Sequence, residues 1–140
     1  MKTAPLPVVA VRAIIVDDDG RVLVLRRQSG STGAGGWCLP GGKVDYGETV
    51  EQAIRREILE ETALECEAAK FLFYQDSPPF EPGGMHCVNL YFECRCRGAL
   101  RLDHESSEHR WIAPLERAGI DMVFRNGEGL SMYWAGRLHE

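Results

Sequence analysis

Residues 42–64 read GKVDYGETVEQAIRREILEETAL, and this stretch decides the fold. It predicts a helix over 49–62, because Thr49 followed three residues later by Gln52 forms a capping box, a common helix start. At about 100° per residue, the first two turns carry an apolar stripe of Val50, Ala53 and Ile54. The helix therefore has one face that packs against a core.

The apolar face of this helix ends in three carboxylates. Glu57 and Glu61 fall within roughly 20° of the stripe's centre, and Glu60 lies beside them. Such groups repel one another and lose hydration, and the helix dipole disfavours negative charge in the last turns. A bound divalent cation would offset the repulsion and the lost hydration of these carboxylates. Their oxygen ligands suit Mg²⁺ or Mn²⁺. The alternative interpretation is a solvated surface with ion pairs such as Arg56 with Glu60.

The spacing within residues 42–64 resembles the signature of the Nudix hydrolases, G-x5-E-x7-R-E-U-x-E-E-x-G-U, in which U is a bulky aliphatic residue. Eight of its nine positions match, namely Gly42, Glu48, Arg56, Glu57, Ile58, Glu60, Glu61 and Leu64. The second glycine is replaced by Ala63, where a left-handed turn would end the helix. Alanine in that conformation costs on the order of 1 kcal/mol, which affects the helix exit and no metal ligand.

The resemblance implies an α+β fold, an α/β/α sandwich with a mixed β-sheet and a loop-helix-loop catalytic element. It implies cleavage of a nucleoside diphosphate linked to another moiety, with Mg²⁺ or Mn²⁺ as cofactor. Arg56 would orient Glu48 or Glu57, and a glutamate would act as the general base. The metal ligands would be Glu57, Glu60, Glu61 and Gly42. Candidates for a further ligand from a late loop are Asp103, Glu105 and Glu108, of which the two glutamates are otherwise solvated loop charges.

Substrate contacts are less specific in the sequence. Gly41 would let the backbone approach the phosphates closely. Arg26 and Arg27 end a strand and could hold a phosphate or ribose, although plain surface charge also explains them. Phe80 and Tyr91 could line a base or sugar pocket, although aromatic residues on alternating strands are commonly core.

The rest of the chain predicts mostly strands. The Asp17–Gly20 turn between two apolar runs indicates a β-hairpin. In residues 85–97 the alternation places Val88 and Phe92 on an apolar face and Asn89 and Glu93 on the opposite, polar face. The expected elements are strands over 8–16, 21–27, 37–39, 66–74, 85–97 and 110–113, and a weakly helical tail over 115–138. Together they predict one domain over 1–140 with a mixed sheet.

Composition narrows the class of protein. The net charge of −5 and the pI near 5.4 argue against nonspecific nucleic-acid binding. No apolar run reaches the roughly 20 residues of a membrane helix, and no secretory leader is recognisable. Five cysteines without a C-x-x-C pair favour free thiols in the cytoplasm. Apolar residues of the tail, such as Met132 and Trp134, are expected in the core or in a homodimer contact.

Two rival interpretations remain open at this point. A Nudix-fold sensing domain would bind a nucleotide without cleaving it, but it would be expected to lack some of the acidic residues that are retained here. An isomerase of isoprenoid diphosphates would need a reactive cysteine, for which Cys38 and Cys87 are candidates.

Overall fold

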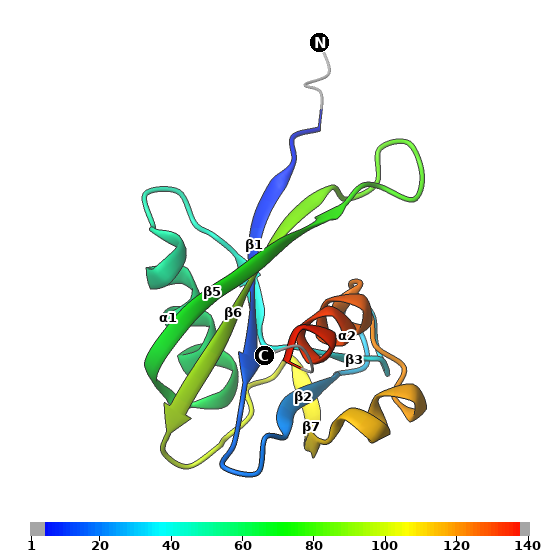
Figure 1. The fold of residues 1–140 in the computed structure, drawn as a ribbon. Coiled ribbons are helices and arrows are strands. Elements are labelled where there is room, and N and C mark those ends of the chain that lie inside the picture. Colours follow the sequence, from blue (N-terminus) through cyan, green and yellow to red (C-terminus); the bar gives the residue numbers. More distant parts are fainter. Residues whose placement is uncertain (1–4, 138–140) are drawn as a thin grey trace.

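The strands divide into two sheets whose central strands are the apolar segments near the N-terminus (Figure 1). The computed structural model describes residues 5–137, so the ends of the predicted domain, including Leu138 of its tail, lie outside the described residues. The elements are β1 (Val8–Ile15), β2 (Val22–Arg27), β3 (Trp37–Cys38), β4 (Gly41–Lys43), α1 (Val50–Thr62), β5 (Glu65–Ser77), β6 (Cys87–Arg97), β7 (Ser106–Ile112), the 3-10 helix η1 (Pro114–Gly119) and α2 (Asn126–Arg137).

The larger sheet has the strand order β4-β1-β6-β5, and the smaller one has the order β3-β2-β7. β1 runs parallel to β6, from Val8 opposite Cys87 to Ile15 opposite Cys94, and all other pairings are antiparallel. The prediction of a mixed sheet is therefore confirmed. The strands predicted over 66–74 and 110–113 were too short, because β5 continues to Ser77 and β7 begins at Ser106.

The prediction of a β-hairpin at residues 17–20 is wrong beyond the turn itself. The turn forms, with Gly20 N–H donating to the Asp17 carbonyl at 3.1 Å and a φ of +79° at Gly20. Only one bridge, Val16 with Val22, joins the two strands, which then enter different sheets. Both strands are apolar on both faces, so each is most stable in the middle of its own sheet, with neighbours on either side.

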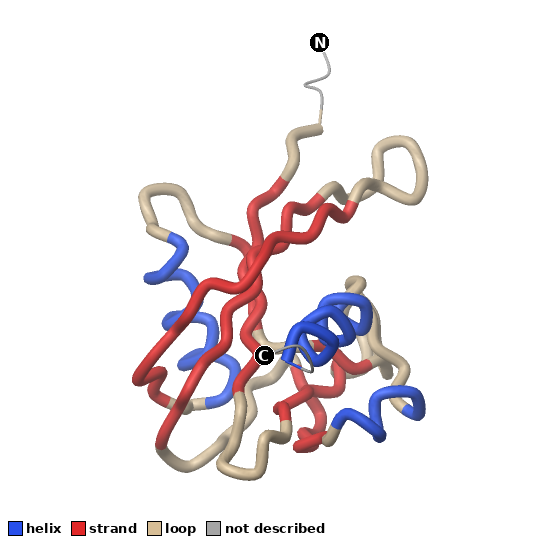
Figure 2. Tube along the Cα trace, viewed as in Figure 1, coloured by secondary structure: helices blue, strands red, loops and turns tan. Residues whose placement is uncertain are grey.

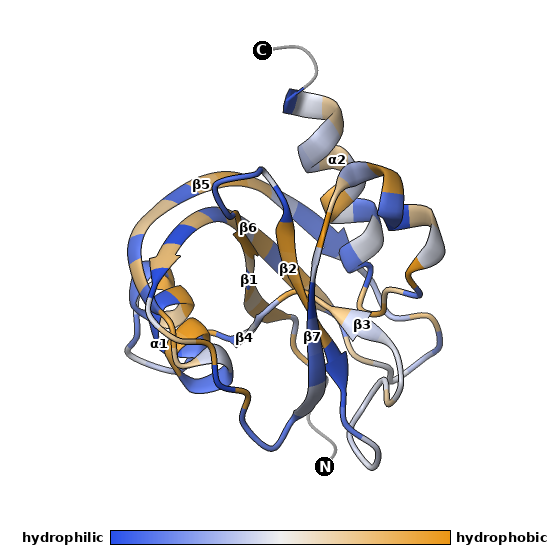
Figure 3. Ribbon diagram, turned by 90° about the horizontal axis from the view of Figure 1, so that it is seen from below, coloured by the Kyte–Doolittle hydropathy of each residue, from blue (hydrophilic) through white to orange (hydrophobic). Residues whose placement is uncertain are grey.

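Alternate residues of β1 and β2 supply two cores, one on each face. Val11, Ala13, Ile15, Leu23 and Leu25 pack with Ala53, Ile54 and Ile58 of α1. Ile14, Val16, Val22 and Val24 pack with Leu130 and Tyr133 of α2. The two helices therefore lie on opposite sides of the strands, and the α/β/α sandwich is confirmed (Figures 2 and 3).

Helix α1 matches its prediction closely. The side chain of Thr49 accepts from the Gln52 backbone, and the Gln52 side chain accepts from the Thr49 backbone, which completes the capping box. Ala63 ends the helix at φ +62°, in the left-handed conformation, and donates its N–H to the Leu59 carbonyl. The apolar stripe begins one turn later than predicted, because Val50 is 38% exposed.

Strand β6 corrects the predicted polar face. Asn89 and Tyr91 lie on that face but are buried. Helix α2 covers them so closely that a Cβ added to Gly129 would lie 2.3 Å from the Tyr91 ring. The helical tail, split into η1 and α2, is thus the element that turns this face of β6 into a core. Within residues 5–137, no helix is long and apolar enough to cross a membrane.

Candidate active site

The C-terminal half of α1 brings a buried carboxylate under the β4 backbone. Glu61 is 6% exposed, and its Oε2 accepts from the Gly41 N–H at 2.8 Å. Burial raises the pKa of Glu61 to about 8, although that hydrogen bond opposes the shift, and the charges of Glu57 and Glu105 add to it. Burial also raises the pKa of Glu57, against the attraction of Arg56. These side chains therefore crowd negative charge where water is scarce.

Arg56 holds the acidic side chains in place. Its Nε and Nη2 donate to the two carboxylate oxygens of Glu48 at 2.7 and 2.9 Å, and its Nη1 donates to Glu57 at 2.8 Å. Nη2 also donates to the Lys43 carbonyl at 3.1 Å. The Arg56 hydrogen bonds, with the Asp45 N–H, lower the pKa of Glu48 to about 2. Arg56 therefore contacts both carboxylates that the resemblance gave as alternatives.

Glu60 lies at the outer edge of this group. It is 56% exposed in its side chain, and one oxygen lies 3.3 Å from Arg56 Nη1. The ion pair of the alternative interpretation is therefore present together with the buried carboxylates. Among residues 5–137, no three acidic, histidine or cysteine side chains form a group that could hold a metal ion as they stand.

The donor set nonetheless has the chemistry of a hard-cation site. Glu57 and Glu61 offer only oxygen ligands, which suit Mg²⁺ or Mn²⁺. A Cβ added to Gly42 would lie 2.7 Å from Glu57 Oε1, so the missing side chain leaves the space that this carboxylate occupies. The residues present therefore fit a divalent cation, with Gly41 and Gly42 as the backbone beside it.

The two glutamates that were predicted as ligands from the late loop have different surroundings. Glu105 lies near enough to Glu57 and Glu61 to raise the pKa of both, and it pairs with Arg27 at 3.6 Å. Glu108 lies on β7 and pairs with Arg26 at 3.0 Å, with both side chains about half exposed. The structure thus brings Glu105 to the carboxylate group and places Glu108 in a surface ion pair.

Arg26 and Arg27 differ in the same way. Arg26 contacts only Glu108 and the Gly35 carbonyl in the described hydrogen bonds and ion pairs. Arg27 is largely buried, and its guanidinium lies 5.6 Å from the centre of the Phe124 ring. Because it also pairs with Glu105, Arg27 lies between the acidic group and the cavity described next.

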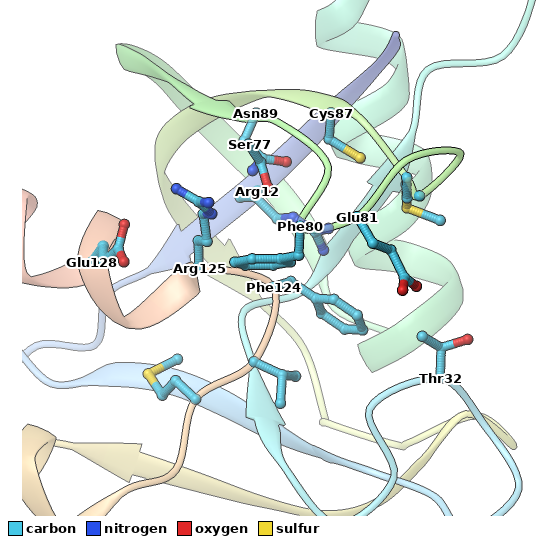
Figure 4. Close-up of a pocket in the computed structure, with 14 residues that line it drawn as sticks. Arg12, Thr32, Ser77, Phe80, Glu81, Cys87, Asn89, Phe124, Arg125 and Glu128 are labelled. Carbon is cyan, nitrogen blue, oxygen red and sulfur yellow. The ribbon is translucent and has the colours of Figure 1, made fainter. Parts of the chain in front are cut away.

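A cavity of about 540 Å³ opens beside this site (Figure 4). It is lined by residues from β1, the β5–β6 loop, the start of β6 and the segment before α2. Phe80 lines it and is 88% exposed, with the Arg125 guanidinium 4.9 Å from its ring centre. Tyr91 does not line it, because its ring is fully buried beneath α2, so its predicted substrate contact is corrected to a supporting position in the core.

Several residues of this cavity were missed by the sequence analysis. Arg12, Asn89 and Arg125 each carry a buried polar atom with no hydrogen-bond partner among the described residues. Phe124 and Arg125 adopt successive φ values of +58° and +59°, which non-glycine residues rarely do outside constrained sites. One signal was present in the sequence, because Arg12 interrupts an otherwise apolar strand.

Comparisons with known proteins agree with this geometry. A family model described as NUDIX domain matches residues 6–128. A MutT-like protein of Streptomyces ambofaciens is 33% identical over 80% of this chain and 68% of its own length. An ADP-ribose pyrophosphatase of Methanocaldococcus jannaschii is 41% identical over 61% of this chain, and the match spans about half of that relative (49%). The crystal structure of a MutT protein from Methanosarcina mazei superposes with a TM-score of 0.82 at 23% identity, covering 99% of this chain and 100% of that one, which shows the fold.

Proposed function

Because the chain belongs to the Nudix hydrolase family, we propose that it is a Mg²⁺- or Mn²⁺-dependent pyrophosphohydrolase. Its substrate would be a nucleoside diphosphate linked to another moiety, such as a further phosphate, a sugar or a second nucleotide. The observation that carries the proposal is the buried Glu57–Glu61 pair, oriented by Arg56 and the Gly41 N–H beside a large cavity. The similarity to the ADP-ribose pyrophosphatase of Methanocaldococcus supports including nucleotide sugars such as ADP-ribose.

The roles follow from the geometry. Glu57, Glu60 and Glu61 would hold the cation, with Glu105 added as a ligand from the loop before β7. When bound, the cation neutralises phosphate charge and lowers the pKa of a bound water. Arg56 keeps Glu48 ionised and holds the carboxylates of Glu48 and Glu57 in a fixed direction. One glutamate of the acidic group accepts the proton of the attacking water. The positively charged Arg27 guanidinium would lie where the phosphates of the substrate meet its nucleoside.

The rival interpretations have less support. The acidic residues whose absence would favour a sensing domain are all present and mutually oriented. A cysteine nucleophile needs a low pKa and access, whereas burial raises the pKa of the Cys38 thiol to about 11 and Cys87 is also buried. All five cysteines are free thiols, which supports the proposed cytoplasmic location. The homodimer stays a prediction that size-exclusion chromatography with light scattering would check.

The test is hydrolysis of a panel of nucleoside triphosphates, ADP-ribose, other nucleotide sugars and dinucleoside polyphosphates, each with Mg²⁺, Mn²⁺ or a chelator. We expect cleavage of a diphosphate linkage that the chelator abolishes. Glu60→Gln should lower kcat/KM by about 10²-fold or more, the scale of a lost catalytic carboxylate. Glu65→Gln is the matched control, because Glu65 is an exposed partner of Arg97 away from the site.

Either of two results would contradict the proposal. They are no cleavage of any member of the panel, and Glu57→Gln and Glu61→Gln proteins whose metal binding and stability equal those of the parent. The first alone would leave a metal-binding sensor as the better account.

A further inference from the structure

One polar atom in the cavity is buried and has no partner. Asn89 lies on β6, is 1% exposed and lines the cavity. Its Oδ1 accepts no hydrogen bond from the residues that the structure describes. Buried side-chain oxygens are nearly always hydrogen-bonded, so an acceptor at this place is explained if a ligand brings the donor.

Gln75 of β5 determines which end of the Asn89 amide is left unpaired. The Asn89 Nδ2 donates to Gln75 Oε1 at 3.1 Å, and the Tyr91 hydroxyl donates to the same oxygen at 2.9 Å. The Gln75 Nε2 in turn donates to the Arg125 carbonyl at 3.1 Å. A backbone carbonyl can only accept, so it fixes the Gln75 amide, which then fixes the Asn89 amide.

The two ends of this chain of hydrogen bonds are themselves well held. The Arg125 carbonyl also accepts from the Gly129 N–H of α2, and Arg125 has a φ of +59°. Burial raises the pKa of Tyr91 to about 12, so its hydroxyl keeps its proton and remains a donor at neutral pH. The cavity therefore presents an acceptor, and not a donor, at Asn89.

The residues around Asn89 indicate which kind of ligand would fit the cavity. Figure 4 shows Asn89 beside Ser77 and Arg12, with the rings of Phe80 and Phe124 lining the same cavity. The ring faces suit a planar heterocycle, and Arg12, whose Nε is also unpaired, offers a donor next to the Asn89 acceptor. This pair is complementary to a ring edge that carries an N–H donor next to an acceptor nitrogen.

We infer that Asn89 is a specificity-determining residue that selects nucleobases with an exocyclic amino group, adenine or cytosine, and that Gln75 is its positioning residue. The inference rests on the proposed function, since it concerns the nucleoside part of the same substrate. An exocyclic group projects farthest from the ring and reaches a buried residue first. An amino group there donates to Oδ1, whereas the carbonyl of hypoxanthine or uracil would place one acceptor against another.

The experiment compares two matched pairs of nucleotides, ATP with ITP and CTP with UTP. Within each pair a carbonyl replaces the amino group at the same place, and the adjacent ring nitrogen changes from an acceptor to an N–H donor. We expect kcat/KM to favour the amino member by at least about 10-fold in at least one pair, because a site built to bond a donor rejects the analogue that lacks it. In Asn89→Leu the ratio should fall toward one, because the amino group loses its acceptor while Arg12 remains.

Gln75→Leu tests the positioning role. Asn89 is retained but its amide becomes free to rotate, so the ratio should also fall toward one. A purely structural role would lower both rates and leave the ratio unchanged. Gln52→Leu is the matched control, because it removes the same kind of side chain from the start of α1, far from the cavity, and should keep the ratio. If circular dichroism shows that Asn89→Leu does not fold, Asn89→Ala replaces it.

Equal rates within both pairs, a preference for the carbonyl member, or a ratio that Asn89→Leu leaves unchanged would overturn the inference while the proposed function stands. If none of the four nucleotides is hydrolysed, isothermal titration of the same four measures their affinities. A ratio of dissociation constants that favours the amino member and is lost in Asn89→Leu would then support the inference without the activity, and equal affinities would overturn it.

Discussion

The backbone at Gly42 approaches the Glu57 carboxylate so closely that a Cβ added there would lie within 2.9 Å of both of its oxygens. Gly41 is tighter still, since its Cβ would lie 2.0 Å from the Val11 carbonyl oxygen of the neighbouring strand. The two glycines are therefore needed for different reasons, one for the site and one for the sheet.

Gly42→Ala should lower activity while the protein still folds. The added methyl group meets the end of a flexible side chain, which can move, but the movement displaces Glu57 from its position next to Arg56. A displacement of about 1 Å at a reacting group can cost about 10²-fold, so we expect kcat/KM to fall 10- to 100-fold by that principle. Gly119→Ala, which meets nothing within 4 Å, is the control. Full activity in Gly42→Ala would show that the position of Glu57 is unimportant.

Arg56→Lys should lower activity although it keeps the charge. A lysine ammonium cannot bridge Glu48 and Glu57 in the way that a planar guanidinium does. Substitutions of residues that orient ligands cost about 10- to 100-fold in activity or metal affinity, and we expect a loss in that range, with the pKa of Glu48 rising from its low value. Arg55→Lys, one residue earlier and hydrogen-bonded to the Cys66 carbonyl, should retain activity. Equal losses in the two variants would remove the special role of Arg56.

The metal-free protein should become less stable as the pH rises from about 5 to about 8. The pKa of Glu61 is about 8 in the folded protein, against 4.5 as its ordinary value. The folded state therefore holds a proton that the unfolded state releases, and this stability is present below pH 4.5 and lost through pH 8. The slope is at most about 1.4 kcal/mol per pH unit for one group. Glu57 adds to it in the same direction.

Urea unfolding in a chelator, at several pH values, measures this slope. Glu61→Gln should reduce it and should stabilise the metal-free protein at pH 8. The low pKa of Glu48 has the opposite effect, but only below about pH 4.5, outside the window. Mg²⁺ should stabilise the parent more at pH 8 than at pH 6, because binding requires the ionised carboxylates. A flat profile in the parent would contradict the buried, protonated Glu61.

Ala63→Gly should stabilise the protein. Ala63 has a φ of +62°, which costs an L-residue about 1–2 kcal/mol, whereas glycine loses more chain entropy on folding. The net gain should be about 0.5–1 kcal/mol by these two principles, measured as the free energy of unfolding. Ala68→Gly is the control, since Ala68 is exposed on β5 and is not among the residues with positive φ, and it should destabilise. A destabilising Ala63→Gly would show that the left-handed turn is relaxed in solution.

The sequence predicted well those features that depend on neighbours along the chain. The capping box, the face of α1 that carries Glu57 and Glu61, and the left-handed turn at Ala63 all follow from spacings within 23 residues. The Asp17–Gly20 turn also formed, but an Asp-Gly signal reports only on local chain reversal. The sheet that each flanking strand joins depends on β6 and β7, which lie far away in the sequence.

The cavity could not be predicted for the same reason. Asn89 reads as solvent-facing in an alternating strand, yet it is 1% exposed and donates to Gln75 of β5, a contact that only the complete sheet brings about. Arg12 and Phe124 are 112 residues apart, yet the guanidinium lies 5.4 Å from the ring centre. Such contacts need the complete fold, because no local pattern distinguishes a strand arginine that enters a cavity from one on the surface.

The division between a short contiguous acidic segment and a cavity gathered from distant segments has an evolutionary consequence. If the cavity binds the nucleoside as proposed, substitutions in the β5–β6 loop or before α2 can change which nucleoside fits without moving the residues from Gly41 to Glu61. Selection can therefore vary the choice of substrate and the rate of bond cleavage almost independently. A lineage built on this plan can acquire new substrates by small steps, each of which leaves a working hydrolase.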